Sequence, residues 1–291
     1  HLARDRELAG AAIDQHEIRD RWHLVGLRQV VVLFVRANLG PCQSGCAKGA
    51  KSSADITYWP MARRAGVELR TRCRVSEILV DDNDMATGVV YYDEHGTERM
   101  QRAEVVVLAC NGVGTPRLLL NSKSARFPDG LANRSGLVGK NLMLHPWGLI
   151  SGVFDAPLAS RFGPAGCCIL SQQFYETDLS RGFVRGYNLQ ITRGSGPVTT
   201  ARTGLTRGQI PWGAGHHEAF ARRYNHTVNI GVCCEDLPDV NNTVTLDPDL
   251  TDSHGIAAPK VTYRLDENSR RMLQHGLDRG SRSEERRVGK E

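Results

Sequence analysis

The stretch Val105-Val-Val-Leu-Ala-Cys-Asn-Gly-Val-Gly-Thr-Pro-Arg-Leu-Leu-Leu120 decides the fold. Its first four residues are all apolar, which is typical of a strand buried on both faces in a parallel sheet. Gly112 and Gly114 then allow a tight turn, and Thr115 followed by Pro116 is a favourable helix start. The stretch therefore predicts either an ordinary strand-to-helix connection or a cofactor site at the N-terminus of the helix.

The residues before this stretch predict an antiparallel meander. Residues 67–80 alternate like a half-buried strand, and residues 88–92 and 97–102 form two further short runs. Polar turns at residues 81–84 and 93–96 separate the three runs. A meander that leads into a buried parallel strand indicates a fold of the α/β (α+β) class.

The second half of the sequence follows a different pattern. Short β-rich runs separated by Gly, Pro and Asn predict an antiparallel sheet, and these runs are residues 149–155, 168–172, 187–192, 227–235, 244–246 and 260–263. Residues 267–280 predict a helix with Met272, Leu273 and Leu277 facing inward. Residues 193–211 are rich in Gly, Thr and Arg, and they predict either a plain surface excursion or a lid over a substrate.

Four segments together resemble the glucose-methanol-choline (GMC) oxidoreductase family, whose members use FAD to oxidise alcohols. They are residues 42–53 with 55–58, residues 105–122, residues 135–146, and residues 242–248 followed by Asp252, Gly255 and Pro259. Several motifs in a fixed order are more specific than any one motif, and the likeness covers residues 40–278. The resemblance implies a partial FAD-binding, Rossmann-like domain with a β-meander, followed by an antiparallel-sheet substrate domain.

The resemblance also divides the chain into parts. Residues 1–37 are an uncertain N-terminal segment, residues 38–146 a partial FAD-binding domain, residues 147–280 a substrate-binding domain, and residues 281–291 a tail outside the family. The family's Gly-x-Gly-x-x-Gly turn and its histidine-bearing closing segment have no counterpart in the sequence. We therefore expect an internal fragment whose own activity is doubtful and whose catalytic residue is unassigned.

The family likeness implies contacts with FAD at eight positions. They are the backbone of Val75 at the adenine end, the residues Ala109, Cys110, Asn111, Gly112 and Thr115 at the strand end, and Asn141 and His145 nearer the flavin. The implied reaction transfers hydride from an alcohol carbon to FAD and gives an aldehyde or ketone, with a general base taking the hydroxyl proton. His145 is not the residue that the family uses as this base. The expected partner is a small alcohol, and the electron acceptor is not indicated.

Cysteines and lysines in one Gly-rich loop leave alternatives open. Cys42 and Cys46 suit a metal or cluster, a loop disulfide or reduced thiols, although no further Cys or His pair at zinc spacing stands beside them. Lys48 and Lys51 either neutralise the FAD pyrophosphate or are solvated surface residues. Two rival functions therefore stay open, namely an electron-transfer or metal-binding module built on the two cysteines and a non-catalytic remnant.

The composition fits a globular enzyme and excludes some partners. The chain has 291 residues, of which 40% are hydrophobic and 24% charged, and its net charge is +5. Nucleic-acid binding favours a basic stripe with interleaved aromatic residues, which the sequence lacks. No apolar run approaches the length of about 18 residues that a membrane span needs, and no signal-peptide layout is present. We expect a cytoplasmic protein without a membrane span and without a nucleic-acid partner.

Overall fold

The computed structural model describes residues 53–159, 167–193 and 196–288. Its contacts divide the chain into a unit of residues 1–35 and a unit of residues 36–291, and every described residue belongs to the second unit. The predictions for residues 1–37 and for Cys42, Cys46, Lys48 and Lys51 lie outside the described residues.

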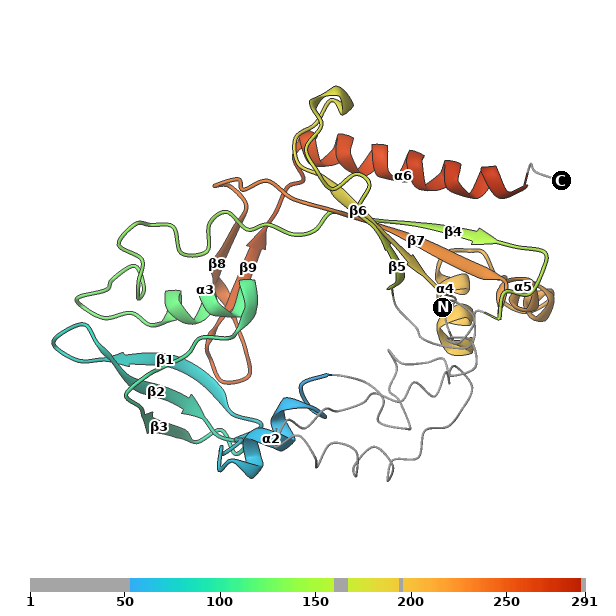
Figure 1. Ribbon diagram of the computed structural model, residues 1–291. Coiled ribbons are helices and arrows are strands. Elements are labelled where there is room, and N and C mark those ends of the chain that lie inside the picture. Colours follow the sequence, from blue (N-terminus) through green and yellow to red (C-terminus); the bar gives the residue numbers. More distant parts are fainter. Residues whose placement is uncertain (1–52, 160–166, 194–195, 289–291) are drawn as a thin grey trace, which may run out of the picture. The chain divides into compact units, whose positions relative to one another are not determined.

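The predicted meander is confirmed as a three-stranded antiparallel sheet. Strand β1 (Arg74–Val80) pairs with β2 (Ala86–Tyr92), and β2 pairs with β3 (Glu98–Arg102) (Figure 1). In the two connecting turns, Asp81 and Asp93 each accept hydrogen bonds from two backbone amides. These side-chain acceptors satisfy amides that the strands leave unpaired, so the turns are fixed by the residues that the sequence places there.

The predicted buried strand at the start of the deciding stretch is wrong. Residues 104–110 pair with no strand among the described residues, and Val105 and Val107 are 76% and 81% exposed. An apolar run becomes a buried strand only where neighbouring strands supply hydrogen bonds and other elements cover its faces. No described element does so here, and the parallel sheet of a Rossmann-like domain is not seen among the described residues.

The helix that follows begins earlier than the sequence predicts. Helix α3 spans Asn111–Asn121, so Gly112 and Gly114 lie inside its first turns instead of forming a turn before it. Asn111 has a φ of +62°, and its side-chain oxygen accepts hydrogen bonds from two amides of the first turn. Asparagine tolerates this left-handed conformation and supplies the acceptor that a capping residue needs, so it takes the role predicted for Thr115.

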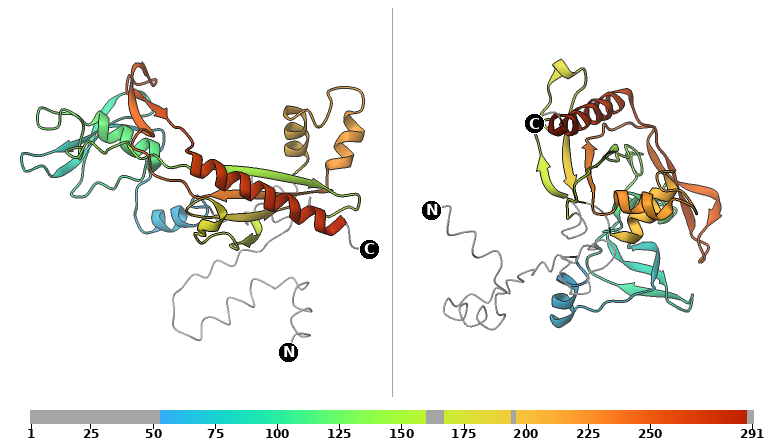
Figure 2. Two further views of the ribbon diagram at one scale, coloured as in Figure 1. Left: turned by 90° about the horizontal axis from the view of Figure 1, so that it is seen from above. Right: turned by 90° about the vertical axis from the view of Figure 1, so that its right-hand side faces the viewer.

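Four of the six predicted runs form an antiparallel sheet with strand order β4-β7-β6-β5, whereas the runs at residues 244–246 and 260–263 lie in a separate two-stranded hairpin. The strands are β4 (Trp147–Val153), β5 (Cys167–Ser171), β6 (Tyr187–Thr192) and β7 (Thr227–Cys234). Helix α6 (Glu267–Val288) packs against β4, β7 and β6, as two views show (Figure 1 and Figure 2). The core between them is apolar and consists of Phe183, Tyr187, Leu189, Ile230, Val232, Cys234 and Met272.

Helix α6 confirms the inward position of Met272, which is fully buried, but it does not end where the sequence predicts. It continues to Val288, so the first part of the tail at residues 281–291 is helical. The polar, unpatterned composition of these residues hid the helix, because a helix that extends beyond its packing surface needs no apolar period.

Glycines let α6 lie close to the sheet, and this closeness can be tested. A Cβ on Gly276 would overlap the side chain of Val232 and lie 3.2 Å from Cε2 of Tyr187. We expect Gly276→Ala to lower the free energy of unfolding by about 1–3 kcal/mol through overpacking. Gly112→Ala is the control, because its Cβ meets nothing within 4 Å, and it should be neutral or slightly stabilising. Urea denaturation measures both variants, and equal stability would contradict the close packing.

Residues 197–206 form a helix, which neither prediction for residues 193–211 specified. This helix, α4 (Pro197–Thr206), packs against α5 (His216–Arg223). Pro197 occupies the first helical position, where a missing N–H has no consequence.

The remaining elements are α2 (Tyr58–Arg64), the short 3-10 helix η4 (Leu179–Arg181), and the hairpin of β8 (Thr243–Thr251) and β9 (Ala257–Thr262). The hairpin packs against α3, and β8 forms one side of a cavity next to this helix. Among the described helices, none combines the length and the apolar character that crossing a membrane requires.

Candidate functional site

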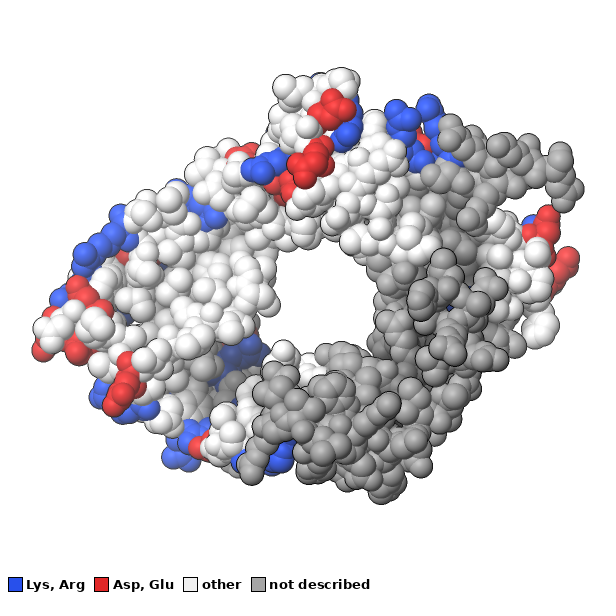
Figure 3. Space-filling model, in the orientation of Figure 1, with Lys and Arg blue, Asp and Glu red and all other residues white. Residues whose placement is uncertain are grey.

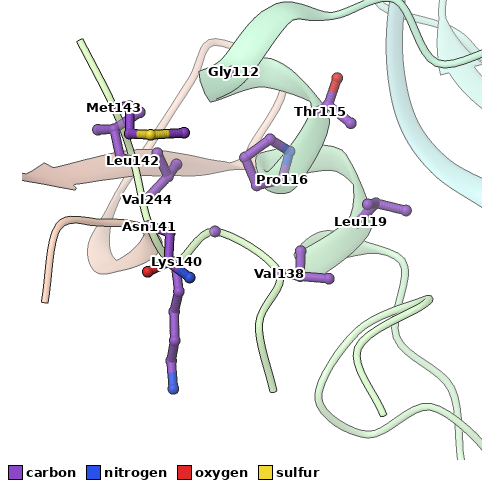
Figure 4. Close-up of a pocket in the computed structure, with 11 residues that line it drawn as sticks. Gly112, Thr115, Pro116, Leu119, Val138, Lys140, Asn141, Leu142, Met143 and Val244 are labelled. Carbon is purple, nitrogen blue, oxygen red and sulfur yellow. The ribbon is translucent and has the colours of Figure 1, made fainter. Parts of the chain in front are cut away.

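The candidate site is a cavity of about 360 Å³ between α3 and the segment of residues 138–143. Helix α3 contributes Gly112, Thr115, Pro116 and Leu119, and β8 contributes Val244 (Figure 4). The lining is mainly apolar, with a hydroxyl and an amide side chain among it. Cavities of this kind bind molecules that have an apolar body and a few polar groups.

Three of the eight predicted FAD contacts line this cavity, namely Gly112, Thr115 and Asn141. Two more, Cys110 and Asn111, form the N-terminal end of α3, and Ala109 directly precedes them. Six of the eight predicted residues therefore lie in or next to the N-terminal part of α3, or in the segment that faces it.

The other two predicted contacts lie away from the cavity lining. Val75 is in β1, where it pairs with Tyr91 of β2. His145 follows the cavity wall and is exposed. Several lining residues were not predicted. Leu142, Met143 and Val244 lie inside motifs that the sequence already marks, but no pattern in the sequence shows that these motifs line one cavity.

Among the described residues that line the cavity, Lys140 is the only charged one. Its side chain extends away from Pro116 and Met143 (Figure 4). The Lys140 ammonium group therefore lies away from the apolar part of the cavity, where solvent or an anionic group can reach it.

Gly139 joins the cavity wall to β8. Its φ is +78°, and a Cβ at this position would overlap the carbonyl oxygen of Val244. The Val244 amide in turn donates a hydrogen bond of 2.6 Å to the Gly139 carbonyl. Both the backbone conformation and the close approach require glycine, which explains its place within the Ser135–Pro146 motif.

His145 is held in one tautomer by the backbone. Its Nδ1 lies 2.8 Å from the carbonyl oxygen of Cys234. A carbonyl oxygen only accepts hydrogen bonds, so Nδ1 carries the proton and Nε2 of the neutral ring is an acceptor. The ring can therefore accept a hydrogen bond from a hydroxyl group at Nε2.

The cysteines whose side chains the structure describes differ in exposure, and only Cys234 among them is buried. Cys73, Cys110, Cys233 and Cys234 are all free thiols. Burial, reinforced by the neighbouring Cys233, raises the pKa of the Cys234 thiol to about 12, so this thiol stays protonated and unreactive at neutral pH. Within the described parts of the chain, no group of three or more His, Cys, Asp or Glu residues is placed to hold a metal ion.

The surface charge of the described residues is mixed. On the face drawn in Figure 3, Lys and Arg lie interspersed with Asp and Glu. Several arginines pair with carboxylates, as in the contacts Arg99–Asp93 (3.1 Å) and Arg222–Asp155 (2.8 Å). This face therefore offers charges of both signs to a ligand.

A protein-family model described as GMC oxidoreductase matches residues 35–147. The chain is 39% identical to 2-methyl-1,2-propanediol dehydrogenase of Mycolicibacterium austroafricanum, over 81% of this chain and 43% of that protein. It is 30% identical to the fructose dehydrogenase large subunit of Gluconobacter japonicus, over 72% and 38% of the two chains. It is 27% identical to the gluconate 2-dehydrogenase flavoprotein of Pantoea cypripedii, over 82% and 41%. The chain thus spans less than half the length of each of these relatives.

Proposed function

We propose that this chain, which belongs to the GMC oxidoreductase family, forms part of an enzyme that uses FAD to oxidise the CH–OH group of alcohols. The relatives named above are dehydrogenases of a diol, a sugar and a sugar acid, and all three compounds carry hydroxyl groups. An alcohol of this kind is the proposed substrate class.

The cavity between α3 and residues 138–143 carries this proposal. Its apolar residues, such as Leu142 and Met143, suit one face of a flat ring system, and Thr115 and Asn141 offer polar groups to its edge. When bound, FAD supplies the acceptor for the hydride that leaves the alcohol carbon. The residues that line the cavity would contact the ring and fix its orientation.

His145 is proposed to act at the entrance of the site. Because its Nδ1 proton is engaged with Cys234, only Nε2 is available to accept a hydrogen bond from an alcohol hydroxyl. This contact would orient the substrate. The general base of the reaction is not assigned to any described residue.

Binding of FAD to the purified chain tests the proposal. We expect FAD fluorescence to be quenched in a saturable way when the 291-residue chain is added. Met143 lines the cavity and is 54% exposed, so Met143→Trp should fill the cavity without unfolding the protein and weaken FAD binding about tenfold.

The matched control is Met100→Trp, because Met100 is 55% exposed and lies in β3, outside the cavity lining. It should bind FAD like the unmodified chain. Failure of the unmodified chain to bind FAD would contradict the proposed function of this chain, and equal weakening by both variants would place the ligand elsewhere. Bleaching of bound flavin on addition of a diol would extend the result from binding to turnover.

A further inference from the structure

Segments that are far apart in the chain meet at the carboxylate of Asp236, just after β7. Its Oδ2 accepts hydrogen bonds from the Leu144 amide (2.9 Å) and from the Tyr263 hydroxyl (2.7 Å). Its Oδ1 accepts from the Leu237 amide (3.0 Å), and the Ser269 hydroxyl, whose shorter hydrogen bond goes to Asp266 (2.6 Å), lies 3.2 Å from it. Burial and the hydrogen bond to Asp236 raise the pKa of Tyr263, so its hydroxyl stays a donor. One carboxylate thus joins the cavity wall to the end of the β8–β9 hairpin and the start of α6.

Two side-chain contacts add to the backbone contacts of residues 142–146, namely the hydrogen bond of His145 Nδ1 to the Cys234 carbonyl (2.8 Å) and that of the Leu144 amide to Asp236 (2.9 Å). At one end, the Leu142 amide donates to the carbonyl of Asn242 (2.9 Å). At the other end, the Pro146 carbonyl accepts from the Cys234 amide (3.0 Å). The amide of Leu144 lies between these two points and donates to the carboxylate described above. A substitution can therefore remove the middle attachment and leave both ends in place.

This attachment bears on the cavity because the two residues just before Leu144, Leu142 and Met143, line it. A hydrogen bond from an amide to a carboxylate is stronger than one between neutral groups. Without it, the middle of the segment has an unpaired amide and can move relative to Pro116 and Leu119 on the opposite wall. The position of the wall, and hence the width of the cavity, depends on this carboxylate.

We propose that Asp236 is a positioning residue whose carboxylate holds residues 142–144 in place and so sets the width of the cavity. The identity of the ligand in this cavity rests on the proposed function, whereas the hold on the wall does not. Asp236 lies outside the cavity lining, so it acts through the backbone of the segment and not by touching the ligand.

Hydrogen exchange measured by mass spectrometry on the intact chain tests the hold on the wall. In Asp236→Ala, we expect the amides of residues 142–145 to exchange about tenfold faster or more, because a charge-assisted hydrogen bond is lost. Tyr263→Phe and Ser269→Ala are matched controls, since the first removes a donor to the same carboxylate, the second removes a hydroxyl beside it, and both keep the Leu144 contact. Both controls should lower the melting temperature and leave exchange at residues 142–145 unchanged.

A general loss of stability is separated from positioning by the same set of variants. Asp236→Asn keeps one acceptor oxygen, so it should give intermediate exchange, and it carries the comparison if Asp236→Ala fails to fold. Unchanged exchange in both Asp236 variants would overturn the proposal. So would a control variant that accelerates exchange at residues 142–145 as much as the Asp236 variants do.

Titration with FAD separates this proposal from the proposed function. We expect the dissociation constant for FAD to rise about tenfold in the Asp236 variants and to stay unchanged in Ser269→Ala. Faster exchange with unchanged FAD affinity would overturn the role of Asp236 in setting the cavity width. An unmodified chain that binds no FAD would overturn the proposed function, and the exchange data would still decide whether Asp236 holds the wall.

Discussion

Replacing Gly139 with alanine is expected to lower the free energy of unfolding by about 3–5 kcal/mol. Two effects add at this position. The backbone has a φ of +78°, which is unfavourable for any residue with a side chain, and the new Cβ overlaps the Val244 carbonyl oxygen. Because that oxygen belongs to the backbone of β8, neither side can yield without separating the cavity wall from the strand. Urea denaturation followed by circular dichroism measures the loss.

Gly136→Ala separates these two effects. Gly136 lies three residues earlier in the same motif and has a φ of +66°, but a Cβ there meets nothing within 4 Å. This variant should lose only the conformational part, about 1 kcal/mol. Equal losses in the two variants would mean that the approach of Gly139 to Val244 is not tight. A large loss in Gly139→Ala alone, with weaker FAD binding, would tie the stability of this contact to the cavity.

The second large effect is expected for Arg117→Ala, which should cost about 2–4 kcal/mol. The guanidinium of Arg117 lies on α3 and is 15% exposed. It donates to the Asp252 carboxylate (2.9 Å) and to the carbonyls of Ala257 (2.8 Å) and Ile256 (3.0 Å) in the β8–β9 hairpin. Its removal leaves the partly buried carboxylate with only the more distant cation of Arg74 (3.8 Å) and leaves two carbonyls without this donor, so the hairpin loosens from α3.

The control for this prediction is Arg134→Ala. Arg134 also contacts an aspartate, Asp84, at 3.0 Å, but its side chain is 81% exposed. Solvent screens such a pair, and the variant should change stability little. If the two arginine variants lose stability equally, burial of the Arg117 contact is not the cause.

Acid titration gives Arg117→Ala a second signature. Burial tends to raise the pKa of Asp252, but hydrogen bonds from the His254 amide and from Arg117 outweigh it, and the pKa lies below its usual value. A carboxyl with a lowered folded-state pKa stabilises the fold above its unfolded pKa of about 4 and loses this contribution as pH falls through the folded value. The stability gap between the unmodified chain and Arg117→Ala should therefore shrink below about pH 4.

Local patterns predicted most of the strands correctly. The run at residues 187–192 has the same bounds in the structure, because alternating apolar residues bury one face of β6 whatever lies around it. The capping role of Asn111 was missed because Thr115-Pro116 is the stronger local pattern, and only the backbone geometry shows which residue begins the helix. Helix α4 was missed because its Gly and Thr content lowers its helix propensity, although Pro197 marks its start.

The candidate site was predictable only where its residues are close in sequence. Gly112 and Thr115 stand in one motif and Asn141 in another, and the family likeness suggested that these motifs meet. The contributions of Val244 and Asp236 depend on how β8 and the end of β7 pack, and no spacing in the sequence encodes them. The prediction that residues 105–108 are buried was wrong for a related reason. An apolar run indicates that its residues favour burial, but it does not indicate which element covers them.

The exposed run at residues 105–110 also governs how the protein behaves in concentrated solution. Val-Val-Val-Leu-Ala-Cys has high β-propensity and contains no charge and no proline. Windows of this composition, when uncovered, pair with the same window of another molecule and seed aggregation. The solubility of the protein therefore depends on whether these six residues are covered. It depends less on the stability of the sheets.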